Sequence, residues 1–137
     1  MSIQLTHIAL TVKNLETSLV FYQEVAGLKT VYRRVGETTP DQVAWIADRV
    51  DNPPFVIVLI GPITPPVEGP GSLTGGSHIG ISVPDRESVD DRARIGRERG
   101  CLMLEPTYVD AVVGYICLLR DPDGNGVEFS YGQSLQV

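Results

Sequence analysis

The sequence predicts an α+β fold built from two copies of one β-α-β-β-β module. A shift of 71 residues lays Ser77–Val83 over Thr6–Val12, with His, Ile and Val identical and the other positions chemically similar. The same shift lays Asp85 over Asn14, and the short side chains of both can cap the first turn of a helix. Each copy therefore begins with a strand that is followed by a capped helix.

In the first copy, the helix and three strands follow in order. Apolar residues at helical spacing predict a helix from about Leu15 to Ala26, and Gly27 can adopt the left-handed conformation that ends it. Three runs of mainly apolar and β-branched residues then predict strands at Lys29–Val35, Gln42–Arg49 and Phe55–Ile60.

The second copy repeats this order with a weaker helix. Val89, Ala93 and Gly96 lie on one helical face, and Gly100 is the expected end. Asp121–Gly126 is rich in turn-forming residues and separates the last two strands. The predicted strands are Cys101–Val109, Val112–Arg120 and Val127–Tyr131.

A chain of 137 residues, of which 42% are apolar and 20% charged, fits one globular domain. We expect module 1 at about 1–60, a linker at 61–76 and module 2 at about 77–137. The linker segment has four prolines and five glycines, which disfavour regular structure, and its length is also compatible with a lid.

Composition disfavours nucleic acid as a partner and a location in the membrane. Seventeen acidic against eleven basic side chains give a net charge of −6, which disfavours binding to nucleic acid. Apolar runs such as Phe55–Ile60 are shorter than the ~20 residues of a membrane span, and the start of the chain does not resemble a leader. We expect a soluble, cytoplasmic protein. Cys101 and Cys117 are expected to be reduced, with a disulfide between them left open.

The two histidines of the sequence are the first candidate functional residues. The repeat places His7 and His78 at the same point of their strands, and Gly80 and Ser82 share the face of His78. In the last strand Glu128 lies opposite the apolar face, and a buried carboxylate needs a partner. Imidazole and carboxylate donors together suit a divalent metal.

Each of these residues also has a simpler interpretation. A single histidine in a strand is more often a hydrogen-bonded residue than a ligand, and Glu128 alone fits a solvated strand position. The equivalence of His7 and His78 in the repeat raises the metal site to the same standing as these simpler interpretations, and the pattern alone leaves both open.

These motifs resemble the vicinal oxygen chelate superfamily, which includes glyoxalase I, bleomycin resistance proteins and extradiol dioxygenases. The resemblance rests on His7–Val12 with Phe21-Tyr22 and Gly27-Leu28, on His78–Val83, and on Asp121–Phe129. It implies that the two modules form an open, cup-shaped mixed sheet with helices outside. A divalent ion (Fe, Mn, Ni or Zn) would be bound inside by His7, His78 and Glu128. The resemblance also implies a small-molecule substrate and a homodimer.

The sequence departs from glyoxalase I in the fourth strand of module 1. There the family often has a Glu or Gln ligand, whereas the apolar run 55–60 has no donor and Val58 is the estimated equivalent. Three ligands resemble the two-histidine, one-carboxylate site of iron oxygenases, which favours a dioxygenase-like enzyme. The alternatives are a glyoxalase-like lyase or isomerase, then a fosfomycin-type transferase, and, from another class, a metal-free protein that binds a drug.

A dioxygenase-like reaction would need a further acid or base. Extradiol dioxygenases typically use an additional histidine, and both histidines here are already assigned as ligands. Tyr108, Tyr115, Tyr131 and Cys117 are candidates from the second module, but a strand tyrosine is more often a packing residue. No catalytic acid or base is assigned from the sequence.

Overall fold

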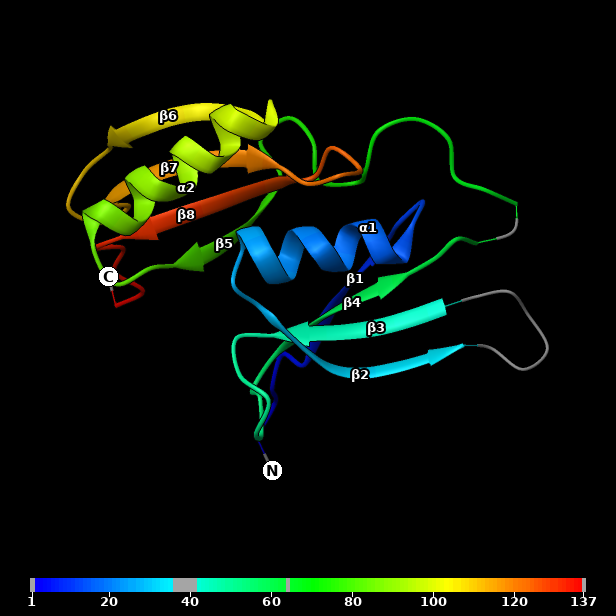
Figure 1. The fold of residues 1–137 in the computed structure, drawn as a ribbon. Coiled ribbons are helices and arrows are strands. Elements are labelled where there is room, and N and C mark those ends of the chain that lie inside the picture. Colours follow the sequence, from blue (N-terminus) through cyan, green and yellow to red (C-terminus); the bar gives the residue numbers. More distant parts are fainter. Residues whose placement is uncertain (1, 36–41, 64, 137) are drawn as a thin grey trace. The chain divides into compact units, whose positions relative to one another are not determined.

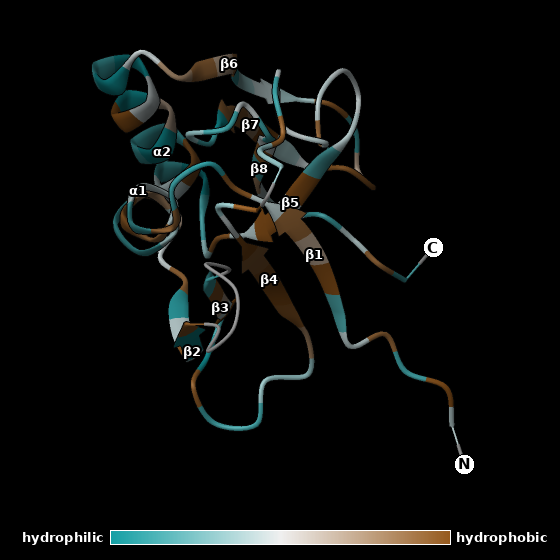
Figure 2. Ribbon diagram, turned by 90° about the vertical axis from the view of Figure 1, so that its right-hand side faces the viewer, coloured by the Kyte–Doolittle hydropathy of each residue, from teal (hydrophilic) through white to brown (hydrophobic). Residues whose placement is uncertain are grey.

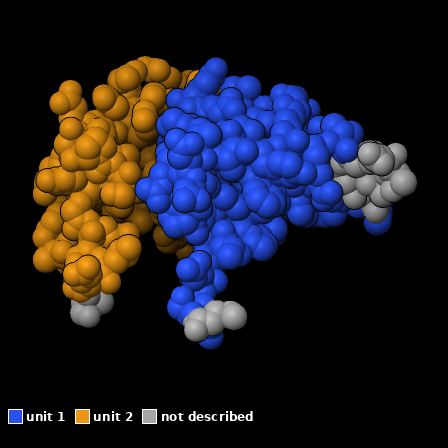
Figure 3. Space-filling model, turned by 90° about the horizontal axis from the view of Figure 1, so that it is seen from below, with its two compact units in different colours: residues 1–72 blue, residues 73–137 orange. Residues whose placement is uncertain are grey.

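The computed structural model describes residues 2–35, 42–63 and 65–136. The chain divides into two compact units, Met1–Ser72 and Leu73–Val137, which are coloured separately in Figure 3. The boundary lies within the segment 61–76, where the described residues form no helix or strand. Each unit contains one β-α-β-β-β module, so the α+β class and the repeated module are confirmed.

Unit 1 is a four-stranded mixed sheet with the strand order β1-β4-β3-β2 (Figure 1). The first strand pairs in parallel with the last one, and the other neighbours are antiparallel. The elements are β1 (His7–Thr11), α1 (Leu15–Val20), the π-helical turn η1 (Phe21–Val25), β2 (Lys29–Val35), β3 (Gln42–Ala47) and β4 (Val56–Ile60).

Unit 2 repeats this topology with the strand order β5-β8-β7-β6, and β5 and β8 are again the parallel pair. Its elements are β5 (His78–Ser82), α2 (Arg86–Arg99), β6 (Leu102–Tyr108), β7 (Tyr115–Arg120) and β8 (Gly126–Tyr131). The correspondence of the two strand orders is the structural counterpart of the repeat in the sequence.

Both predicted helix caps are present. Asn14 Oδ1 accepts a hydrogen bond of 3.0 Å from the Thr17 amide, and Asp85 Oδ1 accepts one of 2.7 Å from the Ser88 amide. These bonds satisfy amide groups that have no partner within the first helical turn. The bonds from Ser88 lower the pKa of the exposed Asp85 carboxyl, because they stabilise its charged form.

The first helix differs from the prediction in its second half. A regular α-helix continues only to Val20, and the chain then widens into η1, where the Ala26 amide donates to the Phe21 carbonyl at 3.2 Å. Gly27, with φ of 76°, follows this turn as expected for a helix-ending glycine. The apolar period used to predict the helix does not distinguish a final α turn from a π turn.

The strand predictions differ from the structure mainly before β7. The strand predicted from Val112 begins at Tyr115, because the residues before it form a tight turn. Asp110 Oδ1 accepts hydrogen bonds from the amides of Val112 and Val113, and Gly114 adopts a φ of 86°. Other strand ends differ from the prediction by one or two residues. β3 ends at Ala47 instead of Arg49, and β4 begins at Val56 instead of Phe55.

In unit 1, one face of the sheet carries the core. Leu10 of β1, Ala44 and Ile46 of β3, and Ile57 and Leu59 of β4 are buried, and the last four form two cross-strand pairs. The neighbouring residues along each strand point to the opposite face because side chains alternate. Figure 2 shows that β4 is hydrophobic along its whole length, so this strand has apolar side chains on both faces.

In unit 2, α2 packs on one face of the sheet. Val89 and Ala93 of α2 are fully buried, as are Leu119 and Phe129 of the strands beneath. Cys117 is buried with them, and its Sγ lies 3.5 Å from the Val89 carbonyl oxygen. Burial raises the pKa of the Cys117 thiol to about 12. Both cysteines are free thiols, as expected.

The Asp121–Gly126 turn is a buried hydrogen-bonded structure. Asp121 Oδ1 accepts from the amides of Asp123 (2.9 Å) and Asn125 (2.8 Å), and its Oδ2 accepts from the Asn125 side-chain amide (2.9 Å). Asn125 Oδ1 in turn accepts from the Leu73 amide at 2.9 Å. The turn therefore fixes both the start of β8 and the beginning of unit 2.

Among the described residues, no helix is both long and apolar enough to cross a membrane.

Candidate functional site

Two predicted ligands lie side by side in unit 2. His78 is the first residue of β5 and Glu128 is in the middle of β8, the strand that pairs with it. His78 Nε2 is 3.9 Å from Glu128 Oε2. Gly80 is directly opposite Glu128, and a Cβ added there would lie 3.5 Å from Oε2. The small residues on this face thus leave space next to the carboxylate, as the alternation in the sequence predicts.

The protonation of the His78 ring follows from its backbone partner. His78 Nδ1 is 2.9 Å from the Gly76 carbonyl oxygen, which can only accept a hydrogen bond. Nδ1 therefore carries a proton, and in the neutral ring Nε2 has a free lone pair. A ligating histidine usually donates its other N–H to a carbonyl or carboxylate in this way, which fixes the tautomer and the ring orientation.

The separation of the pair is longer than a hydrogen bond and slightly longer than the separation of two ligands of one metal. At 3.9 Å the two atoms are too far apart for a hydrogen bond. Two ligands of one metal are separated by roughly 3.0 to 3.5 Å, given metal–ligand bonds of about 2.0 to 2.2 Å. A small rotation of either side chain would bring His78 and Glu128 to this separation. In the neutral ring Nε2 is an acceptor, as the carboxylate oxygen is, and a cation between the two would stabilise the pair.

The burial of Glu128 supports the same interpretation. The residue is 5% exposed, whereas the His78 side chain is 36% exposed. A buried ionised carboxylate is costly without a partner. Within the described part of unit 2, His78 is the basic side chain that lies near it. The carboxylate is thus held in a position where a bound cation would neutralise its charge.

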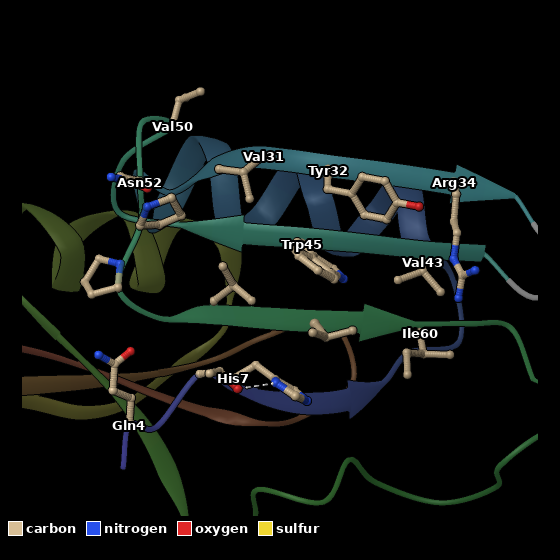
Figure 4. A pocket seen from close by; sticks show the side chains of 15 residues that line it. Gln4, His7, Val31, Tyr32, Arg34, Val43, Trp45, Val50, Asn52 and Ile60 are labelled. Atoms are coloured by element: carbon tan, nitrogen blue, oxygen red, sulfur yellow. Dashed lines mark hydrogen bonds between the residues drawn. The ribbon is translucent and has the colours of Figure 1, made fainter. Parts of the chain in front are cut away.

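The third predicted ligand, His7, is in unit 1. It is the first residue of β1, opposite Val56 of β4, and its Nδ1 lies 2.9 Å from Thr6 Oγ1. Its side chain lines a pocket of about 890 Å³ on the face of the sheet away from the core (Figure 4). Such a volume is within the range of small-molecule sites.

Val58 lies on the same face as His7. It lines the pocket together with Val56 and Ile60 and is itself only 8% exposed, whereas Ile57 and Leu59 lie on the opposite, core face. The position estimated for a fourth ligand therefore faces the pocket and is apolar. On the described part of this face, β4 offers no donor atom for a metal.

The structure brings together two of the three predicted ligands. His78 and Glu128 are neighbours in unit 2, while His7 belongs to unit 1. In the described ranges no three His, Cys, Asp or Glu side chains are grouped closely enough to hold a metal. Ligation by His7, His78 and Glu128 together therefore stays a prediction.

The candidate acids and bases of unit 2 face the other side of the sheet. Tyr115 Oη donates a hydrogen bond of 2.6 Å to Asp90 of α2, which raises the pKa of Tyr115. Tyr131 is its cross-strand partner, and Tyr108 contacts Arg86 of α2. Glu128 pairs with Leu118 on the opposite face. Tyr108, Tyr115 and Cys117 contact α2, and Tyr131 lies on the same face of the sheet as Tyr115, so none of the four is placed next to the His78–Glu128 pair.

Sequence reasoning missed the rest of the pocket. Its lining includes an aromatic pair, Tyr32 and Trp45, and one arginine, Arg34. The signal was present, because alternation along β3 and β4 places Val43, Trp45 and Val58 on one face. The β-bulge between Thr30 and Tyr32 disrupts this alternation in β2 and hides Tyr32 from a simple pattern.

Comparison with known proteins identifies the family. Residues 4–129 match the model of the Glyoxalase/Bleomycin resistance protein/Dioxygenase superfamily. The chain is 39% identical over 137 residues to an uncharacterized protein of Pseudomonas aeruginosa, covering 98% of this chain and 93% of that protein. It is 31% identical over 128 residues to catechol-2,3-dioxygenase of Bacillus subtilis, covering 90% of this chain but only 40% of the dioxygenase.

A solved structure supports the fold. A variant of the fosfomycin resistance protein FosX from Listeria monocytogenes, complexed with Mn(II) and 1S,2S-dihydroxypropylphosphonic acid, has a TM-score of 0.69 and 19% identity. The match covers 99% of this chain and 97% of that one. With its two β-α-β-β-β modules and the family match along most of its length, the chain belongs to the glyoxalase/bleomycin resistance protein/dioxygenase superfamily.

Proposed function

We propose that the protein is a divalent-metal-dependent enzyme with His7, His78 and Glu128 as ligands. Its substrate is a small molecule that chelates the metal through two adjacent oxygens, and its chemistry is dioxygenase-like. The observation that carries this proposal is the His78–Glu128 pair, in which the Gly76 carbonyl holds Nδ1 of the ring and a buried carboxylate lies 3.9 Å from Nε2. The likeness to a catechol dioxygenase supports the reaction class.

The residues of the chain have separate roles in this proposal. The Gly76 carbonyl orients the His78 ring, and Glu128 supplies the negative charge that balances a dication. The apolar side chains of β4 keep a fourth protein donor away, so that ligand positions are left for substrate oxygens. A metal bound there would act as a Lewis acid and as a template that orients the substrate.

A metal and substrate screen tests the proposal. Protein purified without chelator is loaded with Fe(II), Mn(II), Ni(II) or Zn(II), then supplied with catechols and oxygen or with hemithioacetals. We expect oxygen consumption and ring cleavage with catechols and Fe(II). Turnover of hemithioacetals alone would instead assign a glyoxalase-like lyase or isomerase. Tight binding of an organic ligand by protein that retains no metal would contradict the proposal and indicate a drug-binding protein.

Replacing Val58 with glutamate tests how many positions around the metal are open. Because Val58 lines the pocket on the face of His7, Val58→Glu is expected to add a fourth ligand, which would be the second carboxylate of the site. Metal affinity should rise by about tenfold or more, and dioxygenase-type turnover should fall. Chelator competition and oxygen uptake measure the two effects.

Two matched variants control this experiment. Val43→Glu places a carboxylate on the same face but on β3, and Val58→Leu keeps the position apolar. Neither should raise metal affinity. A Val58→Glu protein that melts much earlier and binds metal no more tightly would show that position 58 is not close to the metal.

The homodimer and the cytoplasmic location expected from the sequence are also part of the proposal. Light scattering coupled to size-exclusion chromatography tests the dimer directly. A monomer at micromolar concentration would contradict it without affecting the assignment of the ligands.

A further inference from the structure

The pocket of unit 1 has the composition of a site for an aromatic anion. Its lining is mainly valine, proline and isoleucine, with the aromatic pair Tyr32 and Trp45. Arg34 is the single Lys or Arg among the described lining residues, and no Asp or Glu is among them. An anionic ligand would therefore meet attraction at Arg34 and no carboxylate repulsion from the described lining residues.

Tyr32 and Trp45 form an exposed aromatic surface. They are cross-strand partners on β2 and β3, with ring centroids 5.0 Å apart and planes inclined by 60°. Tyr32 is 44% exposed and Trp45 is 40% exposed, so a large part of both rings is accessible to a ligand. Stacking or edge contacts with a planar ligand would bury this surface.

Arg34 and its neighbour Arg33 have different environments. Arg33 forms an ion pair with Glu16 of α1, so its charge is already balanced. Arg34 lines the pocket, and Figure 4 shows its guanidinium end reaching from β2 toward Val43 and Ile60. Within the described residues Arg34 has no hydrogen-bond or ion-pair partner. Its fork of N–H donors remains available to an anion.

The positions of Arg34 and His7 indicate the shape of the ligand. They are on the two edge strands, β2 and β1, which are separated by three strand spacings, or about 14 Å. Through the registers, Arg34 aligns with Ile60 and His7 with Val56, so they are also displaced along the strands. Trp45 and Val58 lie between them. A ligand that contacts both ends must be elongated.

We propose that this pocket binds an aromatic acid whose carboxylate is carried on a short side chain. The carboxylate pairs with Arg34, the ring packs on Tyr32 and Trp45, and the ring oxygens point toward His7. One guanidinium matches one carboxylate in a bidentate pair, and the described lining residues include no second Lys or Arg to balance the charge of a dianion such as phosphate. The orientation of the ring oxygens rests on the proposed function, but the binding of the acid by Arg34 does not.

Binding to metal-free protein tests this proposal without relying on the metal site. Trp45 is the single tryptophan of the chain, so its fluorescence reports on the pocket directly. The probes are 3-phenylpropanoate and its neutral amide, titrated against protein treated with EDTA. We expect the acid to quench Trp45 and to bind about tenfold more tightly than the amide. Equal binding of acid and amide would contradict the proposal.

Arg34→Gln and Arg33→Gln form a matched pair of variants, with circular dichroism used to verify folding. Arg34→Gln should weaken acid binding about tenfold and leave amide binding unchanged, while Arg33→Gln should change neither by more than about twofold. Equal effects of the two variants would show that Arg34 is not a specific contact. Trp45→Leu, followed by calorimetry, should weaken both probes, and an unchanged affinity would exclude the aromatic surface as the ring site.

A second probe separates this proposal from the proposed function. With metal-loaded protein, 3-(3,4-dihydroxyphenyl)propanoate should bind at least tenfold more tightly than 3-phenylpropanoate. If the acid binds through Arg34 but the dihydroxy compound gains nothing from metal, the metal-centred function fails while the acid site stands. The opposite outcome is also distinguishable. If metal improves binding of the dihydroxy compound equally in wild type and Arg34→Gln, and the acid binds no more tightly than the amide, then the acid site is wrong while the metal-centred function stands.

Discussion

Replacing Glu128 with glutamine is expected to lower the affinity of the protein for a divalent metal by about 100-fold or more. Glutamine has nearly the same shape, but its amide is neutral and a weaker donor than a carboxylate. Removal of groups that only support a ligand already costs about 10- to 100-fold in metal affinity. Loss of the carboxylate itself should have at least that effect. Metal content after dialysis and competition with a chromophoric chelator measure it.

Glu105→Gln is the matched control for this substitution. Glu105 is also a carboxylate of unit 2, but it forms an ion pair with Arg97 at 2.6 Å on an exposed surface. Its removal should leave metal affinity unchanged. The metal-free Glu128→Gln protein should not melt earlier than wild type, because the substitution removes a buried charge. Equal metal binding by both variants and wild type would exclude Glu128 as a ligand.

Asp121→Ala is expected to lower the free energy of unfolding by about 3 kcal/mol. The Asp121 carboxylate accepts three hydrogen bonds, from the amides of Asp123 and Asn125 and from the Asn125 side chain. Asp121 is 5% exposed and Asn125 is fully buried. Without the carboxylate these donors would be buried and unsatisfied, and the contact between Asn125 and Leu73 would lose its support. Urea unfolding followed by circular dichroism measures the loss.

Asp110→Ala is a suitable comparison for Asp121→Ala. Asp110 accepts hydrogen bonds from two backbone amides in the same manner, but its turn is exposed to water. Water can replace the lost acceptor there, so the expected loss is only about 1 kcal/mol. Equal losses for the two variants would show that burial of the Asp121 turn does not determine its contribution.

The fold was largely predictable because its signals are local. Asn14 and Asp85 cap helices through hydrogen bonds to amides three residues further along the chain. Gly27 and Gly100 end helices through their own backbone conformation. The repeat then extends every local prediction from one unit to the other. The turn before Tyr115 was mispredicted because the apolar residues around it match a strand pattern, although Asp110 redirects the backbone.

The candidate site was predictable only in part. The face of Glu128 follows from alternation along its strand, and its proximity to His78 was inferred from the repeat and is present in the structure. The bond between His78 and the Gly76 carbonyl depends on the path of an irregular segment, which no periodic pattern describes. Arg33 is paired with Glu16 of α1, and this leaves Arg34 as the arginine that can bind an anion. The difference depends on the position of α1 in the folded unit, which the sequence pattern does not give.

The parallel pairing of the first and last strands in each unit has a consequence for how the chain can be divided. In both sheets every strand neighbour comes from the same half of the sequence. Leu73, which pairs with the turn before β8, belongs to the second half as well. A cut of the backbone after Ser72 would therefore break none of the strand ladders. The two fragments, produced from separate genes, would each contain a complete set of sheet partners. The first would carry one of the three proposed metal ligands, His7, and the second would carry the other two, His78 and Glu128.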